Sequence, residues 1–87
     1  MIYRILTEDK GNIAQIVSKH FDAFTIIRAQ GYWKGTAENS VVIELDSLGL
    51  ADMLFSSRVH ILATDIKTTN NQDAVLVQKI TAESELV

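Results

Sequence analysis

The sequence predicts an α+β domain in which a four-stranded antiparallel sheet carries two helices on one of its faces. Three observations support this class. The length of 87 residues suits a single domain. Hydrophobic residues make up 47% of the chain, which is typical of a packed fold. Strand-like and helix-like patterns also follow one another along the chain in the order β-α-β-β-α-β.

The first strand and the first helix are predicted within the first 21 residues. Residues 1–7, MIYRILT, are rich in β-forming side chains and alternate roughly between apolar and polar. The polar residues that follow break this strand. In residues 12–21 the apolar side chains recur with the spacing of one helical face, and they are Ile13, Ile16, Val17 and Phe21.

The middle of the chain predicts a β-hairpin. Residues 23–33 and 39–46 both have strand character. In the second of these segments Val41, Ile43 and Leu45 form one apolar face. The connection, residues 34–38, is short, so the two strands are expected to pair antiparallel.

The last third of the chain predicts a second helix and a final strand. Residues 74–80, AVLVQKI, are almost continuously apolar, which is typical of a strand in the interior of a sheet. The tail, residues 81–87, is expected either to be disordered or to dock on a neighbouring subunit. The helix is expected within residues 47–69, with a stripe made of Leu50, Leu54, Ile61, Leu62 and Ile66.

These elements and spacings are those of the ferredoxin-like β-α-β-β-α-β sandwich, formed by residues 1–87 as one domain. Two helices cover only one face of such a sheet. The second face is expected to be apolar too, with Val42 and either Ile26 or Ile27 on it. An apolar open face in a domain this small predicts self-association.

Charge and composition exclude several classes of protein. The 8 basic and 11 acidic residues give a net charge of −3, which disfavours a nucleic-acid binder. No run of 18 apolar residues is present, and the N-terminus lacks the pattern of a signal peptide. We therefore expect a cytoplasmic protein that does not engage membranes. The absence of cysteine excludes disulfides and thiolate metal sites.

Motifs for covalent or metal chemistry are missing. The chain has no G-x-S-x-G, P-loop or G-x-G-x-x-G segment. Ser18, Lys19 and His20 are adjacent on a predicted helix, so their side chains do not face one another. His20 and His60 do not occur at H-x-x-x-H spacing. The expectation is a protein that is not an enzyme, with no cofactor and no metal site.

A cluster of polar and aromatic residues around the predicted hairpin is the best candidate for ligand binding. Arginine and lysine can hold phosphates, an aromatic ring can stack on a base, and Gln or Glu can read base edges. Alternatively, Tyr32 and Trp33 pack in a subunit interface, and Arg28 pairs with an acid such as Glu44. The candidate ligand-binding residues are Arg28, Gln30, Tyr32, Trp33, Lys34, Glu38 and Ser40.

Residues 31–45, GYWKGTAENSVVIEL, resemble the signature segment of the CutA proteins. In that segment an aromatic–Trp–x–Gly turn, here Tyr32 to Gly35, precedes an acid, here Glu38, and an apolar strand. Residues 70–80 are similar to the region around the last CutA strand. The resemblance implies the trimeric ferredoxin-like architecture that CutA shares with the PII signalling proteins, with clefts between subunits. The segment is also similar to small phage and bacterial proteins.

The departures from that family limit what is carried over. The CutA cysteine and its His-Pro-Tyr segment are missing here, so the metal role proposed for CutA is not transferred. The long loop that PII proteins use to bind partners is reduced here to a few residues. A PII-type partner loop is therefore not expected.

The function predicted from the sequence is that of a non-enzymatic, trimeric, PII-like module. It is expected to bind a small anionic ligand, a nucleotide, at clefts between subunits. Its role would be sensing, or sequestration of a nucleotide signal if the protein is phage-encoded. The main alternative is a structural or interaction protein that acts through its oligomer surface, and a CutA-type metal-handling protein comes third.

Overall fold

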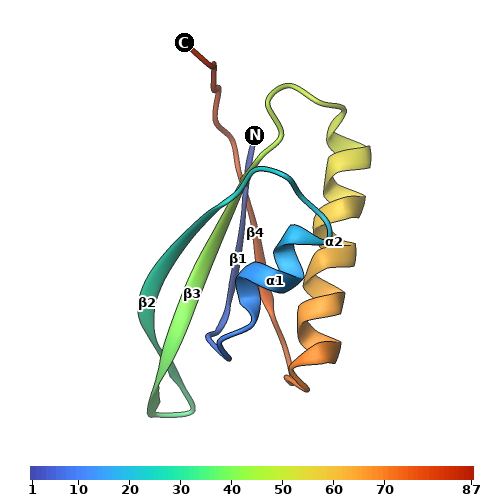
Figure 1. Ribbon diagram of the computed structural model, residues 1–87. Coiled ribbons are helices and arrows are strands. Elements are labelled where there is room, and N and C mark those ends of the chain that lie inside the picture. The colour runs from blue at the N-terminus through green and yellow to red at the C-terminus, as the bar shows by residue number, and fades with distance from the viewer.

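The computed structural model describes all residues, 1–87, and contains four strands and two helices. The strands form one antiparallel sheet in the order β2-β3-β1-β4, and both helices cover the same face of it (Figure 1). The predicted α+β, ferredoxin-like arrangement is confirmed. The elements are β1 (Ile2–Glu8), α1 (Ile13–Ser18), β2 (Thr25–Trp33), β3 (Thr36–Asp46), α2 (Asp52–Thr69) and β4 (Leu76–Ile80).

Alternation in the two central strands decides which side chains enter the core. Successive strand residues point to opposite faces, so every second residue of β1 and β3 meets the helices. In β1 these residues are Tyr3, Ile5 and Thr7, and all three are buried. Ile5 lies opposite the buried Ile43 of β3. The core is therefore built on the centre of the sheet.

The helices complete the core, and α2 does so with only part of the stripe that was predicted. The four apolar residues of the first helical segment, which ends at Phe21, are buried as expected. In α2 the predicted Leu62 and Ile66 are buried, and Phe55 and Val59 join them because these four residues share one helical face. Three members of the predicted stripe, Leu50, Leu54 and Ile61, are exposed.

The connection between β2 and β3 is shorter than predicted. β3 begins at Thr36, which pairs with Trp33, so only Lys34 and Gly35 form the turn. Their φ angles are 51° and 81°, and two positive φ angles in succession are typical of a type I′ turn. Residues 36–38, predicted to be part of the connection, extend the hairpin beyond the rest of the sheet (Figure 1).

The strand β4 lies at an edge of the sheet, so its predicted place in the interior is wrong. It pairs with β1 alone, and only alternate residues meet the core. Val75 and Val77 pack against the core, whereas Leu76 is 53% exposed on the other face. Residues 81–87 form neither helix nor strand. No helix is long and apolar enough to cross a membrane.

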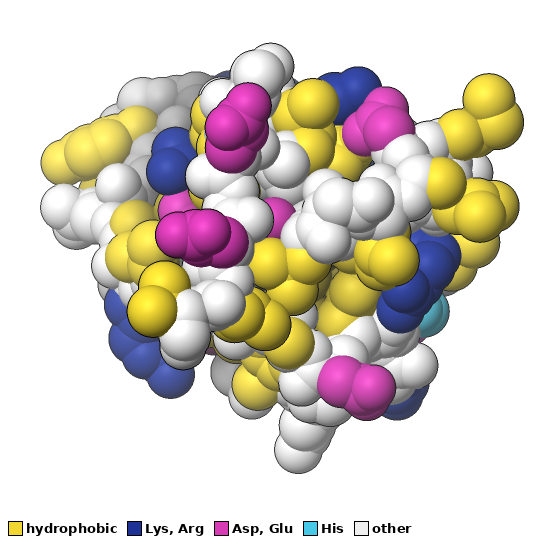
Figure 2. Space-filling model, turned by 90° about the horizontal axis from the view of Figure 1, so that it is seen from above, with side chains coloured by type: hydrophobic (Ala, Val, Ile, Leu, Met, Phe, Trp, Pro, Cys, Tyr) yellow, Lys and Arg dark blue, Asp and Glu magenta, His cyan; other side chains and the backbone are white.

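The face of the sheet opposite the helices carries apolar side chains, as expected. Ile27 lies opposite Val42, so Ile27 and not Ile26 belongs to this open face. A second exposed apolar area lies at the end of the molecule that holds both termini (Figures 1 and 2). It includes Leu48, Leu50, Met53 and Leu54.

Candidate functional site: a pocket beside the hairpin

A hollow of about 700 Å³ lies at the end of the sheet where β1 ends and β4 begins. We call it the hairpin pocket. Its size is typical of sites for small molecules. Four segments line it: residues 6–8 with Lys10, residues 29–33, Glu38 with residues 40–42, and residues 70–76.

Small residues of the hairpin leave room in the pocket. Gly31 lies opposite Glu38, and Ala29 lies opposite Ser40, so these residues share the open face of the sheet. A Cβ atom added at Gly31 would lie 2.4 Å from the Ser40 Oγ. Gly31 sits within β2 and its φ is not positive, so the backbone conformation does not require a glycine there. The close approach of Ser40 explains the glycine instead.

Five of the seven predicted ligand-binding residues line the hairpin pocket. They are Gln30, Tyr32, Trp33, Glu38 and Ser40. Tyr32 and Trp33 are 70% and 51% exposed, so they are accessible for stacking. The uninterrupted pairing of the two strands puts Trp33, Glu38 and Ser40 on the open face of the sheet, whereas Gln30 and Tyr32 occupy the alternate positions of β2.

The two predicted cations, Arg28 and Lys34, do not line the pocket. Arg28 lies opposite Val41, on the helix side of the sheet, and its Nη1 is 2.7 Å from the Asp9 Oδ2. The ion pair expected between Arg28 and Glu44 is absent, because Glu44 lies on the open face of the sheet, where it pairs with Arg4 at 2.8 Å. Lys34 belongs to the turn, with its Nζ 5.7 Å from the centroid of the Trp33 ring.

The charge of the pocket is negative. Its lining holds three carboxylates, from Glu8, Glu38 and Asp73, and a single basic side chain, Lys10. The ammonium of Lys10 lies 3.2 Å from a Glu8 carboxylate oxygen. Carboxylates beside exposed aromatic faces favour a ligand that carries positive charge. This arrangement is the opposite of the one expected for an anionic ligand.

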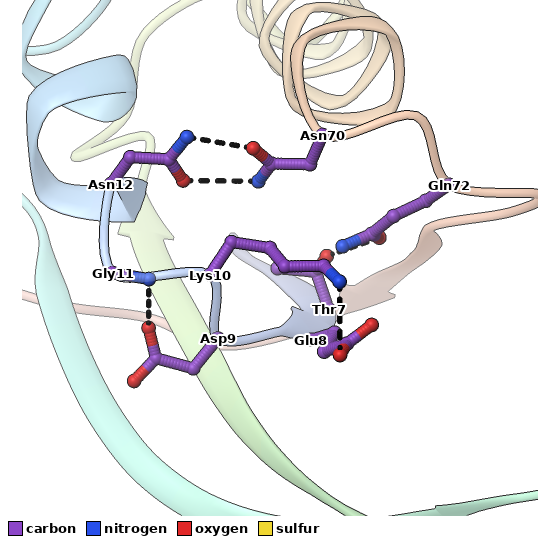
Figure 3. Close-up of polar contacts among 8 residues, drawn as sticks. All are labelled: Thr7, Glu8, Asp9, Lys10, Gly11, Asn12, Asn70 and Gln72. Carbon is purple, nitrogen blue, oxygen red and sulfur yellow. Dashed lines mark hydrogen bonds and ion pairs between the residues drawn. The ribbon is translucent and has the colours of Figure 1, made fainter.

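Amide and hydroxyl contacts join the two loops that form one wall of the pocket (Figure 3). Asn12, at the start of α1, and Asn70, at the end of α2, exchange two side-chain hydrogen bonds of 2.7 and 3.1 Å. Close by, the Thr7 hydroxyl donates to the Gln72 side-chain oxygen at 2.6 Å. These contacts hold the α2–β4 loop against the end of β1.

The end of α2 directs the chain into this wall. Asn71 has a φ of 52°, and the amide N–H of Gln72 donates to the Lys67 carbonyl at 3.0 Å. The Asn71 N–H donates to the Thr68 carbonyl at 3.3 Å, which completes a Schellman motif. The sequence analysis placed residues 70–73 only as the connection between the predicted helix, within 47–69, and the predicted strand, 74–80. The Asn-Asn pair was the available signal, since asparagine favours the left-handed position after a helix.

Other polar clusters tie elements together and do not line the pocket. The hydrogen bond from His20 at 2.7 Å, followed by the one from Thr69, lowers the pKa of Asp65. Tyr3 donates to Asp52 at 2.6 Å, and burial raises the pKa of the Tyr3 hydroxyl. No group of three or more metal-ligating side chains comes together in the structure.

Comparisons with known proteins find the fold but no family. No protein-family model matches the sequence, and no curated protein matches it. Among solved structures, a phage SAM lyase without ligand is 22% identical, with a TM-score of 0.64 over 98% of this chain and 91% of that one. A phage SAM lyase in complex with S-methyl-5′-thioadenosine is 23% identical, with a TM-score of 0.58 over 87% of this chain and 76% of that one.

A de novo designed protein, Foldit4, is 17% identical, with a TM-score of 0.50 over 94% of both chains. Likenesses at these identities show a shared fold. None of these proteins is a PII or CutA protein, so that resemblance stays a prediction.

Two predictions need correction. The two phage SAM lyase structures share this fold over most of the chain, and their name is that of an enzyme and not of a sensor. This contradicts the predicted non-enzymatic, PII-like nucleotide module. It also contradicts the prediction that the chain is not an enzyme, which assumed that catalysis requires a nucleophile or metal motif.

Proposed function

We propose that this protein is a lyase that cleaves S-adenosylmethionine (SAM) and releases S-methyl-5′-thioadenosine from the hairpin pocket. The observation that carries the proposal is the likeness to phage SAM lyase over nearly the whole of both chains. The acidic, aromatic lining of the pocket supports it independently. A phage origin and a cytoplasmic location accompany this proposal.

The lining suits the chemical groups of SAM. The substrate carries a positive sulfonium and a positive ammonium, and the pocket offers Glu8, Glu38 and Asp73 to them. Trp33 and Tyr32 can stack on the adenine ring or face the sulfonium. Lys10 is the one basic side chain available to the substrate carboxylate.

The chemistry also explains why no nucleophile motif is needed. When the bond between sulfur and the Cγ of the amino-acid chain breaks, the sulfur takes the electron pair and becomes a neutral thioether. No proton has to be delivered to that leaving group. A lyase adds no water, so the electron pair that Cγ loses to sulfur must be replaced from within the substrate. Either the substrate carboxylate attacks it and a lactone forms, or a base removes a β-proton and an alkene forms.

What remains for the protein is positioning and exclusion of water. The carboxylates can hold the cationic groups so that the amino-acid chain adopts the reactive conformation. Stacking on the exposed rings can shield the reacting carbon from solvent. Both tasks use groups that the pocket contains.

The test is incubation of the purified protein with SAM, followed by chromatography of the thioadenosine product. A protein-free blank corrects for spontaneous breakdown of SAM. Trp33→Ala and Glu38→Gln should reduce product release strongly, whereas Arg28→Ala, outside the pocket, should not. No product above the blank would refute the proposal. The lactone and the alkene are isomers, so NMR of the second product distinguishes the two routes.

We also propose that the chain assembles as a homotrimer through the open face of its sheet. Ile27 on this face is 45% exposed and lies outside the hairpin pocket, so another copy can cover it while the pocket stays open. Burial of such a surface against other copies would stabilise a domain with a small core. Light scattering should give three times the chain mass of 9.7 kDa. A monomer at micromolar concentration would refute the assembly.

A further inference from the structure

The side-chain nitrogen of Gln72 has no hydrogen-bond partner although it is buried. Every other buried side-chain nitrogen or oxygen in the molecule has a hydrogen-bond partner. The same residue lines the hairpin pocket. Native structures satisfy nearly all buried polar atoms, because an unpaired donor loses its hydrogen bonds to water without replacement. The exception at this position therefore needs an explanation.

The structure around Gln72 fixes the direction of its amide. The Schellman motif at the end of α2 holds the Gln72 backbone through the hydrogen bond to Lys67. The hydroxyl of Thr7, which is only 6% exposed, holds the side-chain oxygen at 2.6 Å. The nitrogen is thus positioned in advance, which is typical of groups that recognise a ligand.

We propose that the Gln72 side-chain nitrogen donates a hydrogen bond to the nucleoside part of the ligand. This inference rests on the proposed function. SAM offers three kinds of acceptor, namely its carboxylate, the ribose oxygens and the purine ring nitrogens. The sulfonium and the ammonium accept no hydrogen bond, and the acidic lining is available to both. The carboxylate is best matched by the charged Lys10, which leaves the neutral acceptors of the nucleoside for the neutral amide.

Lys10 lines the same pocket as Gln72 and can move when a ligand enters. In Figure 3 the Lys10 side chain reaches toward Glu8. Its ion pair with Glu8 is 3.2 Å long, and the Lys10 side chain is 44% exposed. Exposed ion pairs of this kind contribute little stability, so the lysine can leave Glu8 easily. Its movement would bring the ammonium to the substrate carboxylate.

The test separates the nucleoside from the amino-acid part of SAM, because S-methyl-5′-thioadenosine contains only the first. Calorimetry measures its Kd, and steady-state assays measure KM and kcat for SAM. Gln72→Glu removes the donor and keeps an acceptor for Thr7, and Gln72→Met removes both. Gln15→Met, on the exposed side of α1, is the matched control.

Gln72→Met should raise the Kd for S-methyl-5′-thioadenosine and the KM for SAM by the same factor, about tenfold. Gln72→Glu should raise the Kd for the neutral S-methyl-5′-thioadenosine similarly, whereas its added carboxylate also attracts cationic SAM and makes the rise in KM smaller. The kcat should stay within about twofold, since the contact is equal in ground and transition states. The control should match the wild type. In the wild-type protein, the Gln72 side-chain NH₂ resonances should shift when S-methyl-5′-thioadenosine is added.

Three results would overturn the assignment. An increased KM for SAM with an unchanged Kd for S-methyl-5′-thioadenosine would place the contact on the amino-acid part. If the KM for SAM and the Kd for S-methyl-5′-thioadenosine are both unchanged, or if the NH₂ resonances do not move, Gln72 has only a structural role. A wild-type protein that neither binds S-methyl-5′-thioadenosine nor cleaves SAM would instead refute the proposed function, and the assignment with it.

Discussion

Replacement of Gly31 by leucine should abolish SAM cleavage while the fold survives. Gly31 lies in the floor of the hairpin pocket, and its position needs no positive φ, so a larger residue is compatible with the strand. The new Cβ would lie 2.4 Å from the Ser40 Oγ and 3.4 Å from the Ser40 Cβ. The Ser40 hydroxyl must therefore rotate, and the remaining leucine atoms occupy the hollow.

Two opposing terms set the change in stability. Forcing Ser40 into a less favourable rotamer costs about 0.5–1.5 kcal/mol. Removal of a glycine from a strand interior gains about 0.5–1 kcal/mol. The net change in the free energy of unfolding should thus stay within about 1 kcal/mol, which corresponds to a shift in Tm of at most about 4–8 °C for a domain of this size.

The change in activity should be far larger. A substrate displaced by about 1 Å can lose about 100-fold in rate, and leucine displaces it by more than that. Product chromatography measures the rate, and calorimetry measures Tm. Ala37→Leu is the control, because Ala37 lies on the same hairpin opposite Tyr32 and does not line the pocket. Wild-type cleavage by a folded Gly31→Leu variant would refute the assignment of the site to this hollow.

Three further predictions concern the fold. Tyr3→Phe should cost about 1 kcal/mol at pH 7, because the buried hydroxyl loses its 2.6 Å hydrogen bond to Asp52. Hydrogen bonds from Lys79 and then Tyr3 lower the pKa of Asp52 from 3.8, so this carboxylate stabilises the fold above that pH and loses its effect as pH falls through the lowered pKa. The difference between wild type and variant should therefore narrow below about pH 4 in urea unfolding, and an equal gap at pH 3 and pH 7 would contradict this reading. Leu62→Ala removes a fully buried side chain and should cost about 2–5 kcal/mol by urea unfolding, and a loss under about 1 kcal/mol would deny its central place in the core. Asn71→Gly should raise Tm and Asn71→Ala should lower it, because a φ of 52° disfavours a Cβ, and equal Tm values would argue against the Schellman geometry.

Local patterns along the chain predicted the architecture because each follows from the geometry of one element. The period of two in Val41, Ile43 and Leu45 identified a strand and its buried face. The helical spacing of Ile13, Ile16, Val17 and Phe21 identified α1. The short connection predicted the hairpin, although Lys34 and Gly35 alone make the turn.

Patterns within one element did not decide how that element lies against the others. The apolar run of β4 is compatible with an interior strand, and only the sheet order places it at an edge. In α2 two overlapping apolar stripes were available, and packing against Tyr3 and Phe21 selected the one that contains Phe55. The partner of Arg28 was likewise decided by the side of the sheet on which it lies.

The candidate site, too, was predicted in part from local sequence and was decided in part by tertiary packing. From the sequence alone, the chain's composition and periodicity determined a ferredoxin-like domain and pointed to five pocket residues on one continuous hairpin, because neighbours in a hairpin are neighbours in sequence. Tertiary structure alone brought Glu8, Lys10 and Gln72 to the same hollow, since these residues lie up to 64 positions apart and meet only when β1 and the end of α2 pack together. That packing makes the pocket acidic where the sequence suggested a site for an anion, and it leaves one buried amide nitrogen without a partner.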